Sequence, residues 1–191
     1  RFAFVACVPA EFEHIESYVA LIQRAKQSRL PVPPLRFENL EKLRALVSHV
    51  EISPHVAEFL SLLSLRMKRE TSNIEQAALK RHREATLEGE DPEPPYRSTK
   101  YHSKRTLQKA AAILKTLVAR DWIRQNGNRS LEASFQDAQA LERFFCMNGP
   151  EDAFIQTLQK SSTDPHERSQ MDTILNERKI FRKHFKEIQE E

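Results

Sequence analysis

The chain has 191 residues, and its 30 Lys and Arg residues against 27 Asp and Glu residues give a formal net charge of +3 at pH 7. This length can bury a sizeable core, and a hydrophobic content of 39% excludes a chain that is disordered throughout. So small a net charge does not require a nucleic-acid partner. Two cysteines, Cys7 and Cys146, cannot form a disulfide framework, and no apolar run is long enough to span a membrane, so we expect a cytoplasmic protein.

The N-terminal part predicts a strand followed by a helix. Residues 2–8 are apolar and aromatic, which favours a short buried strand that ends before Pro9. The next stretch, 11–27, is typical of an amphipathic helix because its apolar residues recur at three- and four-residue spacing: Phe12, Ile15, Val19 and Ile22. Since the chain begins without methionine, directly in the strand, we expect it to be a piece of a longer protein.

Two more helices are predicted before a change in composition. Residues 39–49 place four apolar side chains on one face, and Ser53-Pro54 is a strong start signal because serine caps a helix and proline suits its first position. Apolar residues nearly encircle the helix that follows, up to Met67, so its first half should lie in the core. Residues 71–100 are charged and contain several prolines, which favours an insertion that is loop or partly disordered.

A long helix is expected over 104–120, and its start suits a phosphate group. Ser103 is the predicted cap, and Lys104 and Arg105 lie in the first turn, where free N–H groups and the helix dipole already attract anions. The three glycines, Gly89, Gly127 and Gly149, have no P-loop spacing. Any nucleotide that Arg105 contacts must therefore be held mainly by other residues.

The C-terminal part predicts three further helices. Ser134 and Asp137 form a capping-box pattern before a helix that reaches about residue 145, a short helix begins near Pro150, and Asp164-Pro165 begins a last one. We expect this last helix to pack against a partner or against its own domain. The predicted fold is mainly α: a helical bundle with a short N-terminal strand and a C-terminal helical extension.

Catalytic and metal-binding patterns are not found. Neither the histidines nor the cysteines have the spacing that presents metal ligands together, so we predict no metal site. No Gly-x-Ser-x-Gly elbow occurs, and neither cysteine has a histidine beside it in the sequence. Hydrolysis by the side chains of this chain alone is therefore not supported.

The order of these elements carries a family resemblance. The chain begins with Arg1-Phe2 and a strand, followed by a helix, a proline break, two helices and an insertion. Ser103-Lys104-Arg105 then stands at the head of an alanine-rich helix. This order resembles the end of a MoxR-type AAA+ ATPase, with the RavA branch the most similar. Residues 133–138, before the next helix, are similar to the segment that precedes the family's final lid helix. The same order of lid elements occurs in minichromosome-maintenance helicases and magnesium chelatases.

This resemblance implies a division of the chain and a role for two arginines. Residues 1–30 would be the end of the AAA+ core, 35–147 the helical lid with its insertion at 71–100, and 150–191 a C-terminal extension. Arg1 would be the inter-subunit arginine and Arg105 the sensor-2 arginine, with Ser103 and Lys104 beside the nucleotide. The cofactor would be ATP, with Mg²⁺ held by a core that this chain lacks, so the chain alone would not hydrolyse ATP.

The implied partners are neighbouring subunits of a homo-oligomeric, hexameric ring and a client or adaptor protein that the ATPase remodels in a chaperone-like way, with no membrane involved. Two other interpretations remain open from the sequence. A winged-helix module would place the 104–120 helix in the DNA major groove, use 121–124 and 131–135 as a two-stranded wing, and contact phosphate through Arg124 and Arg129. A helical adaptor without a nucleotide is the third.

Overall fold

The computed structural model describes residues 37–92, 95–100, 102–147 and 150–191. Arg1, the predicted strand at 2–8 and the predicted helix at 11–27 lie outside the described residues. In the described part the fold is mainly helical, as predicted, and the strand content is a pair of two-residue strands.

The first described elements follow the predicted signals. Helix α2 (Phe37–His49) is followed by strand β1 (Glu51–Ile52) and helix α3 (Pro54–Leu87). Ser53 caps α3, with its Oγ accepting a hydrogen bond from the backbone N–H of Val56 at 3.4 Å, and Pro54 occupies the first turn. Both helix starts predicted here are therefore confirmed to within two residues.

The prediction of a loop over residues 71–100 is wrong for 71–87, which continue α3 to a length of 34 residues. This stretch contains charged residues but neither glycine nor proline, and most of its residues have good helix propensity. The helix ends where the first strong breaker appears: Gly89 adopts φ +83°, and its N–H bonds to the carbonyl of Thr86 at 3.2 Å.

Helix α4 (Lys104–Arg124) and strand β2 (Glu132–Ala133) exclude the predicted wing. Residues 121–124, assigned to the first wing strand, are the last turn of α4. Strand β2 pairs in parallel with β1, with Glu51 opposite Glu132 and Ile52 opposite Ala133, rather than with the segment just before it. An antiparallel wing therefore does not form from these residues.

The C-terminal helices are α5 (Phe135–Gln139), α6 (Glu142–Phe145), α7 (Asp152–Ser161) and α8 (Pro165–Glu190). Ser134 and Asp137 form the predicted capping box, but the single helix predicted after them is broken at Ala140 and Leu141. Asp164 caps α8 by accepting from the N–H of His166 at 2.8 Å.

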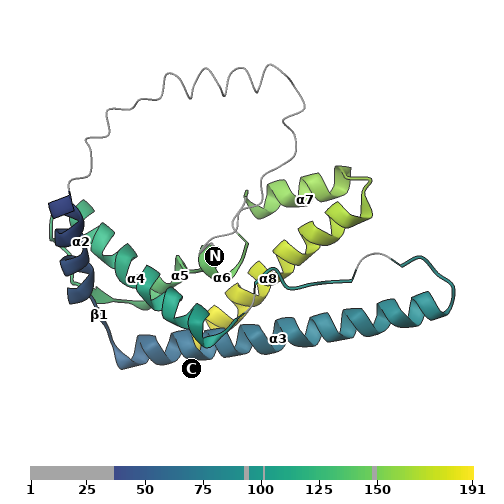
Figure 1. The fold of residues 1–191 in the computed structure, drawn as a ribbon, viewed down its shortest axis with the longest axis horizontal. Coiled ribbons are helices and arrows are strands. Elements are labelled where there is room, and N and C mark those ends of the chain that lie inside the picture. Colours follow the sequence, from purple (N-terminus) through teal and green to yellow (C-terminus); the bar gives the residue numbers. More distant parts are fainter. Residues whose placement is uncertain (1–36, 93–94, 101, 148–149) are drawn as a thin grey trace, which may run out of the picture.

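Figure 1 shows α3 along one side of the molecule, α8 packed on α3, and α7 folded back along α8. Helix α4 packs on α2 and also contacts α3. The last helix packs against its own domain, because Ile180, Phe181 and Ile188 of α8 belong to the main core. The rest of that core is shared mainly by α3, α4, α5 and α6: Val50, Val56, Phe59, Leu60, Leu63, Met67, Ala110, Leu114, Val118, Ala119, Ala133, Ala138, Leu141, Phe144, Phe145 and Cys146.

Two glycines with nearly equal positive φ angles offer a matched test of this packing. A Cβ at Gly127, with φ +81°, would lie 3.2 Å from a ring carbon of Trp122, whereas one at Gly89 would meet nothing within 4 Å. We expect Gly89→Ala to cost about 1 kcal/mol of the free energy of unfolding through backbone strain alone, and Gly127→Ala to cost about 1 kcal/mol more, because Trp122 must also move. Urea denaturation of both variants measures the difference, and equal losses would contradict the packing of Trp122.

Candidate functional site

Three of the four sequence-predicted site residues, Ser103, Lys104 and Arg105, are consecutive and lie at the start of α4. Ser103 and Thr106 form a reciprocal capping box, with Ser103 Oγ accepting from Thr106 N at 3.2 Å and Thr106 Oγ1 accepting from Ser103 N at 3.3 Å. The cap at Ser103 is thus confirmed, and its partner Thr106 is a residue that the sequence analysis missed. Lys104 and Arg105 are exposed in the first turn.

Arg105 has no ion-pair or hydrogen-bond partner among the described residues, unlike several other arginines of the chain. Arg129 pairs with Asp137 at 2.8 Å, and Arg178 pairs with Asp152 at 2.7 Å. An exposed, unpaired guanidinium at the positive end of a 21-residue helix can contact an anion without first giving up an internal partner.

A short extended segment, residues 95–100 with His102, connects the far end of α3 to the start of α4, and we call it the strap. The carboxylate of Glu177, on α8, holds its middle. Glu177 Oε1 accepts from Thr99 N at 2.6 Å, from Ser98 Oγ at 3.1 Å and from the Tyr96 hydroxyl at 3.5 Å, and Oε2 accepts from Thr99 Oγ1. Four donors from three residues of the strap therefore converge on one carboxylate.

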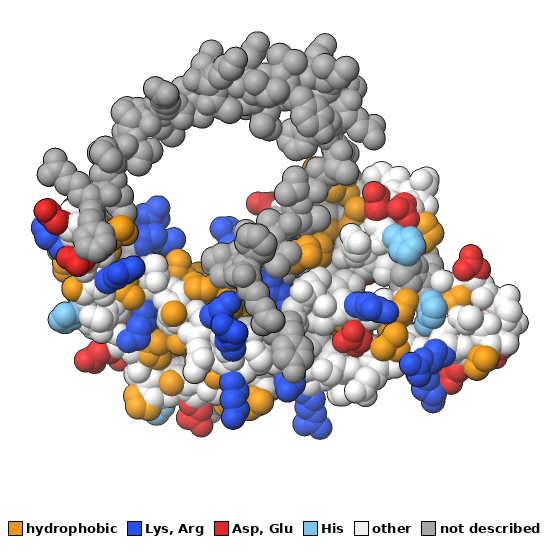
Figure 2. Space-filling model, in the orientation of Figure 1, with side chains coloured by type: hydrophobic (Ala, Val, Ile, Leu, Met, Phe, Trp, Pro, Cys, Tyr) orange, Lys and Arg blue, Asp and Glu red, His pale blue; other side chains and the backbone are white. Residues whose placement is uncertain are grey.

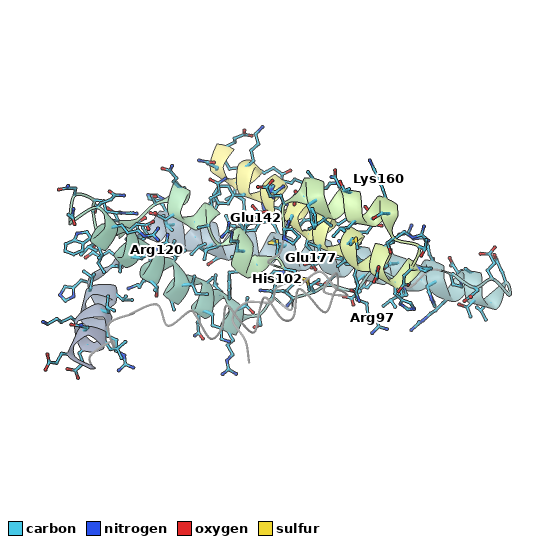
Figure 3. All side chains as sticks on the ribbon, turned by 90° about the horizontal axis from the view of Figure 1, so that it is seen from above. Arg97, His102, Arg120, Glu142, Lys160 and Glu177 are labelled. Atoms are coloured by element: carbon cyan, nitrogen blue, oxygen red, sulfur yellow. The ribbon has the colours of Figure 1, made fainter. Side chains whose placement is uncertain are left out.

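The end of the strap is fixed to α6 as well. Lys100 Nζ donates to the carbonyl oxygen of Phe144 at 2.6 Å and lies 5.3 Å from the centre of the Phe144 ring. His102 is buried and stacks on Phe145 with ring centroids 5.7 Å apart. Figure 3 places Glu177 and His102 in the middle of the molecule, whereas Arg97, on the same strap, lies at its edge. The residue before the Ser103 cap is thus anchored in the core.

Burial shifts the pKa of three strap residues, Tyr96, Lys100 and His102, and of Glu177 on α8. It raises the pKa of Glu177 despite the hydrogen bonds from Thr99, Ser98 and Tyr96, and it raises the pKa of the Tyr96 hydroxyl, with the Glu177 charge adding to the effect. Burial lowers the pKa of Lys100, and it lowers the pKa of His102 to about 4, with the charge of Lys100 as a second cause. His102 is therefore neutral at physiological pH.

The same turn of α8 is also tied to the chain between α6 and α7. The backbone carbonyl of Glu177 lies 3.4 Å from Cys146 Sγ. Next to it, Arg178 donates to the carbonyl oxygens of Pro150 at 2.8 Å and Met147 at 3.2 Å, besides its pair with Asp152. Residues 177 and 178 therefore join the strap on one side to the chain before α7 on the other.

A groove of about 960 Å³ lies elsewhere, between α4, α6, α7 and α8, and contains four arginines. Three of them are already paired: Arg120 with Asp121 at 2.8 Å, Arg178 with Asp152, and Arg182 with both Asp152 and Glu142. These internal pairs make the groove a weaker anion site than the start of α4, where the cations are unpaired.

Sequence reasoning missed Glu177, although one signal was present. Glu177 lies in the apolar stripe of α8, between Ile174 and Phe181 at three- and four-residue spacing, and a carboxylate on an apolar helix face predicts a buried group that needs partners. The pattern does not indicate which donors form hydrogen bonds with this carboxylate. Arg1, the other sequence-predicted catalytic residue, lies outside the described residues.

One of the two arginines that the winged-helix interpretation assigns to phosphate, Arg129, is already paired. Arg129 is bound to Asp137 through two hydrogen bonds of 3.0 and 2.8 Å, so it is not available for phosphate without breaking that pair. On the face that Figure 2 shows, Lys and Arg side chains are scattered among acidic and apolar ones. No basic patch is thus visible on that face, and the exposed cations at the start of α4 are a local feature.

Among the described residues, no group of three or more His, Cys, Asp and Glu side chains could hold a metal ion. None of the helices in the described ranges is long and apolar enough to cross a membrane. Comparisons with protein-family models, with curated proteins and with solved structures gave no match for this chain.

The buried, neutral His102 makes the fold sensitive to acid. Because its pKa is lowered to about 4 from 6.5, its contribution to stability is present above pH 6.5 and is lost as the pH falls towards 4. Relative to His102→Phe, which can keep the contact with Phe145, we expect the wild-type chain to lose about 1–2 kcal/mol of unfolding free energy between pH 7 and pH 5.

Urea denaturation of both proteins at the two pH values measures this loss. Glu177 acts in the opposite direction, since its raised pKa favours the folded state as the pH falls, but it is present in both proteins and cancels in the comparison. The same pH dependence in the wild type and in His102→Phe would contradict the assignment.

Proposed function

We propose that this chain is the helical lid part of a MoxR-type AAA+ ATPase, in which Arg105 contacts the γ-phosphate of ATP. The ATP, with its Mg²⁺, would be bound by a core domain, and the lid would close on it. The observation that carries this proposal is Arg105 itself: it is exposed, it has no partner among the described residues, and it lies in the first turn of a long helix whose start is firmly capped.

Three features of the described residues support this assignment. The lid-like order of helices is present from α2 to α5, with Ser53 and Ser134 each capping the helix that follows a strand of the parallel pair. Arg105 lies on open surface, which suits a site that a second domain completes. Its helix start is anchored to the core through His102 and the strap, so the Arg105 side chain would extend from a fixed position of the backbone.

Chemically, Arg105 would stabilise the negative charge on the γ-phosphate and would lose that contact when the phosphate leaves. Lys104 and the free N–H groups of the first turn would add to the positive potential. The change in contact would alter the position of the lid, and so couple hydrolysis to the remodelling of a client protein by a cytoplasmic, hexameric ring. In that ring Arg1 would face the nucleotide of the neighbouring subunit.

The test is Arg105→Ala in the longer protein that carries the nucleotide-binding core. We expect ATP turnover to fall about 100-fold or more, because a charge contact made at the transferred phosphate is lost, while the folded state is retained. Arg124→Ala is the matched control: Arg124 is an exposed arginine at the opposite end of α4, away from the proposed phosphate.

Normal turnover in a folded Arg105→Ala protein would refute the proposal. So would the finding that the natural sequence upstream of Arg1 carries no phosphate-binding loop, because without such a loop Arg105 would have no nucleotide to contact.

A further inference from the structure

We infer that Glu177 is a positioning residue for the Arg105 site: its carboxylate fixes the strap to α8 and thereby sets where α4 begins. This inference rests on the proposed function. Glu177 lies far from Arg105 in the sequence and acts through the strap, not by contact with a nucleotide.

The first step is the connection between Glu177 and the helix cap. Thr99 gives both its backbone N–H and its hydroxyl to Glu177, and only three residues separate it from Ser103. Lys100 and His102, between them, are bound to Phe144 and stacked on Phe145. A chain held at 99, 100 and 102 leaves the cap at 103 little freedom to move relative to α8.

The second step is that the carboxylate has no substitute in this position. Glu177 is 1% exposed, so in the folded chain its carboxylate, and not bulk water, is the acceptor that the half-buried strap donors share. If it is lost, the N–H and the hydroxyl of Thr99 lose their acceptor, and the Ser98 hydroxyl keeps only the carbonyl oxygen of Lys100 at 2.9 Å, so the strap should leave α8. The cations at 104 and 105 would then no longer be held in one place.

The third step is that the same turn of α8 extends this connection away from the site. Arg178 holds the carbonyls of Met147 and Pro150 and the carboxylate of Asp152 at the start of α7. A movement of the start of α4 would therefore be passed through residues 177 and 178 to α7. The strap and α8 thus form a physical route from the proposed phosphate contact to the C-terminal helices.

The first experiment measures hydrogen exchange in the 191-residue chain without nucleotide. The reporters are the amides of Thr106 and Leu107, which bond to Ser103 Oγ at 3.2 Å and to Ser103 O at 3.1 Å. We expect Glu177→Ala to speed their exchange about tenfold, whereas amides of the α3–α8 contact change much less. Glu177→Gln should remain close to the wild type, because the amide oxygen can accept from Thr99 N and Ser98 while its NH₂ donates to the Thr99 hydroxyl.

Two further variants keep the test decisive. Thr99→Val removes one donor from the strap side and should give a smaller change of the same kind, so it decides the question if Glu177→Ala does not fold. Ile188→Ala destabilises α8 at its far end, away from the strap, and controls for a general loss of stability. Unchanged exchange at Thr106 and Leu107 in Glu177→Ala, or in Thr99→Val where the alanine variant is unfolded, would overturn the inference.

The second experiment measures the preference for ATP over ADP in the longer protein with its core. A contact to the γ-phosphate creates this preference, and a smaller folded fraction does not change the ratio. We expect Glu177→Ala and Arg105→Ala each to reduce the ratio of ATP affinity to ADP affinity about tenfold, and Glu177→Gln to retain the wild-type ratio. The double variant that combines Glu177→Ala with Arg105→Ala should reduce the ratio no further than Arg105→Ala alone.

The two proposals fail in different ways. If Arg105→Ala leaves ATP turnover normal, the proposed function is refuted, whereas faster exchange at Thr106 and Leu107 in Glu177→Ala would still establish the hold of Glu177 on the helix start. If Arg105→Ala abolishes turnover and a folded Glu177→Ala protein keeps its full preference for ATP, the positioning role alone is refuted.

Discussion

The described part of this molecule depends on one buried carboxylate. Glu177 sits in the apolar stripe of α8 and accepts hydrogen bonds from Tyr96, Ser98 and Thr99, which leave the end of α3 and lead to α4. Without an acceptor there, the segment between α3 and α4 would either leave α8 or keep its half-buried donors unpaired, at a cost of up to about 1–3 kcal/mol for each. The route of the chain between α3 and α4 is thus decided by a residue of the last helix.

Burying the carboxylate of Glu177 costs free energy, and hydrogen-bond donors around it compensate part of that cost. Burial raises the pKa of Glu177, so the charged form is less stable there than in water even with its donors in place. Lys100, whose own pKa burial lowers, bonds to the carbonyl of Phe144 instead of closing an ion pair with Glu177. The hydrogen bonds of the strap, rather than a salt bridge, compensate the buried charge. Because hydrogen bonds are directional, this set of bonds specifies one position for the strap more strictly than apolar packing does.

The functional consequence concerns how a helix start becomes a site. Many helices have a serine cap and a cation in the first turn, and these features alone attract anions only weakly. Here the cap follows His102, which is buried against Phe145, so the exposed Lys104 and Arg105 extend from a fixed point of the core. This combination of a rigid base and unpaired cations is what a AAA+ lid would need in order to read the γ-phosphate of a nucleotide bound elsewhere.

The sequence by itself determined where most helices begin and which faces they bury. The starts at Ser53-Pro54, Ser103, Ser134 and Asp164-Pro165 were all predicted, because a cap is satisfied within three residues of its own position. The tertiary structure alone decided the pairing of β1 with β2, the break between α5 and α6, the extent to which the charged second half of α3 stays helical, and the partners of Glu177. These features depend on contacts between distant parts of the chain, such as that of Glu177 with Thr99, which lies 78 residues away. The spacing of apolar residues indicates which face of a helix is buried, but it does not indicate which distant segment covers that face.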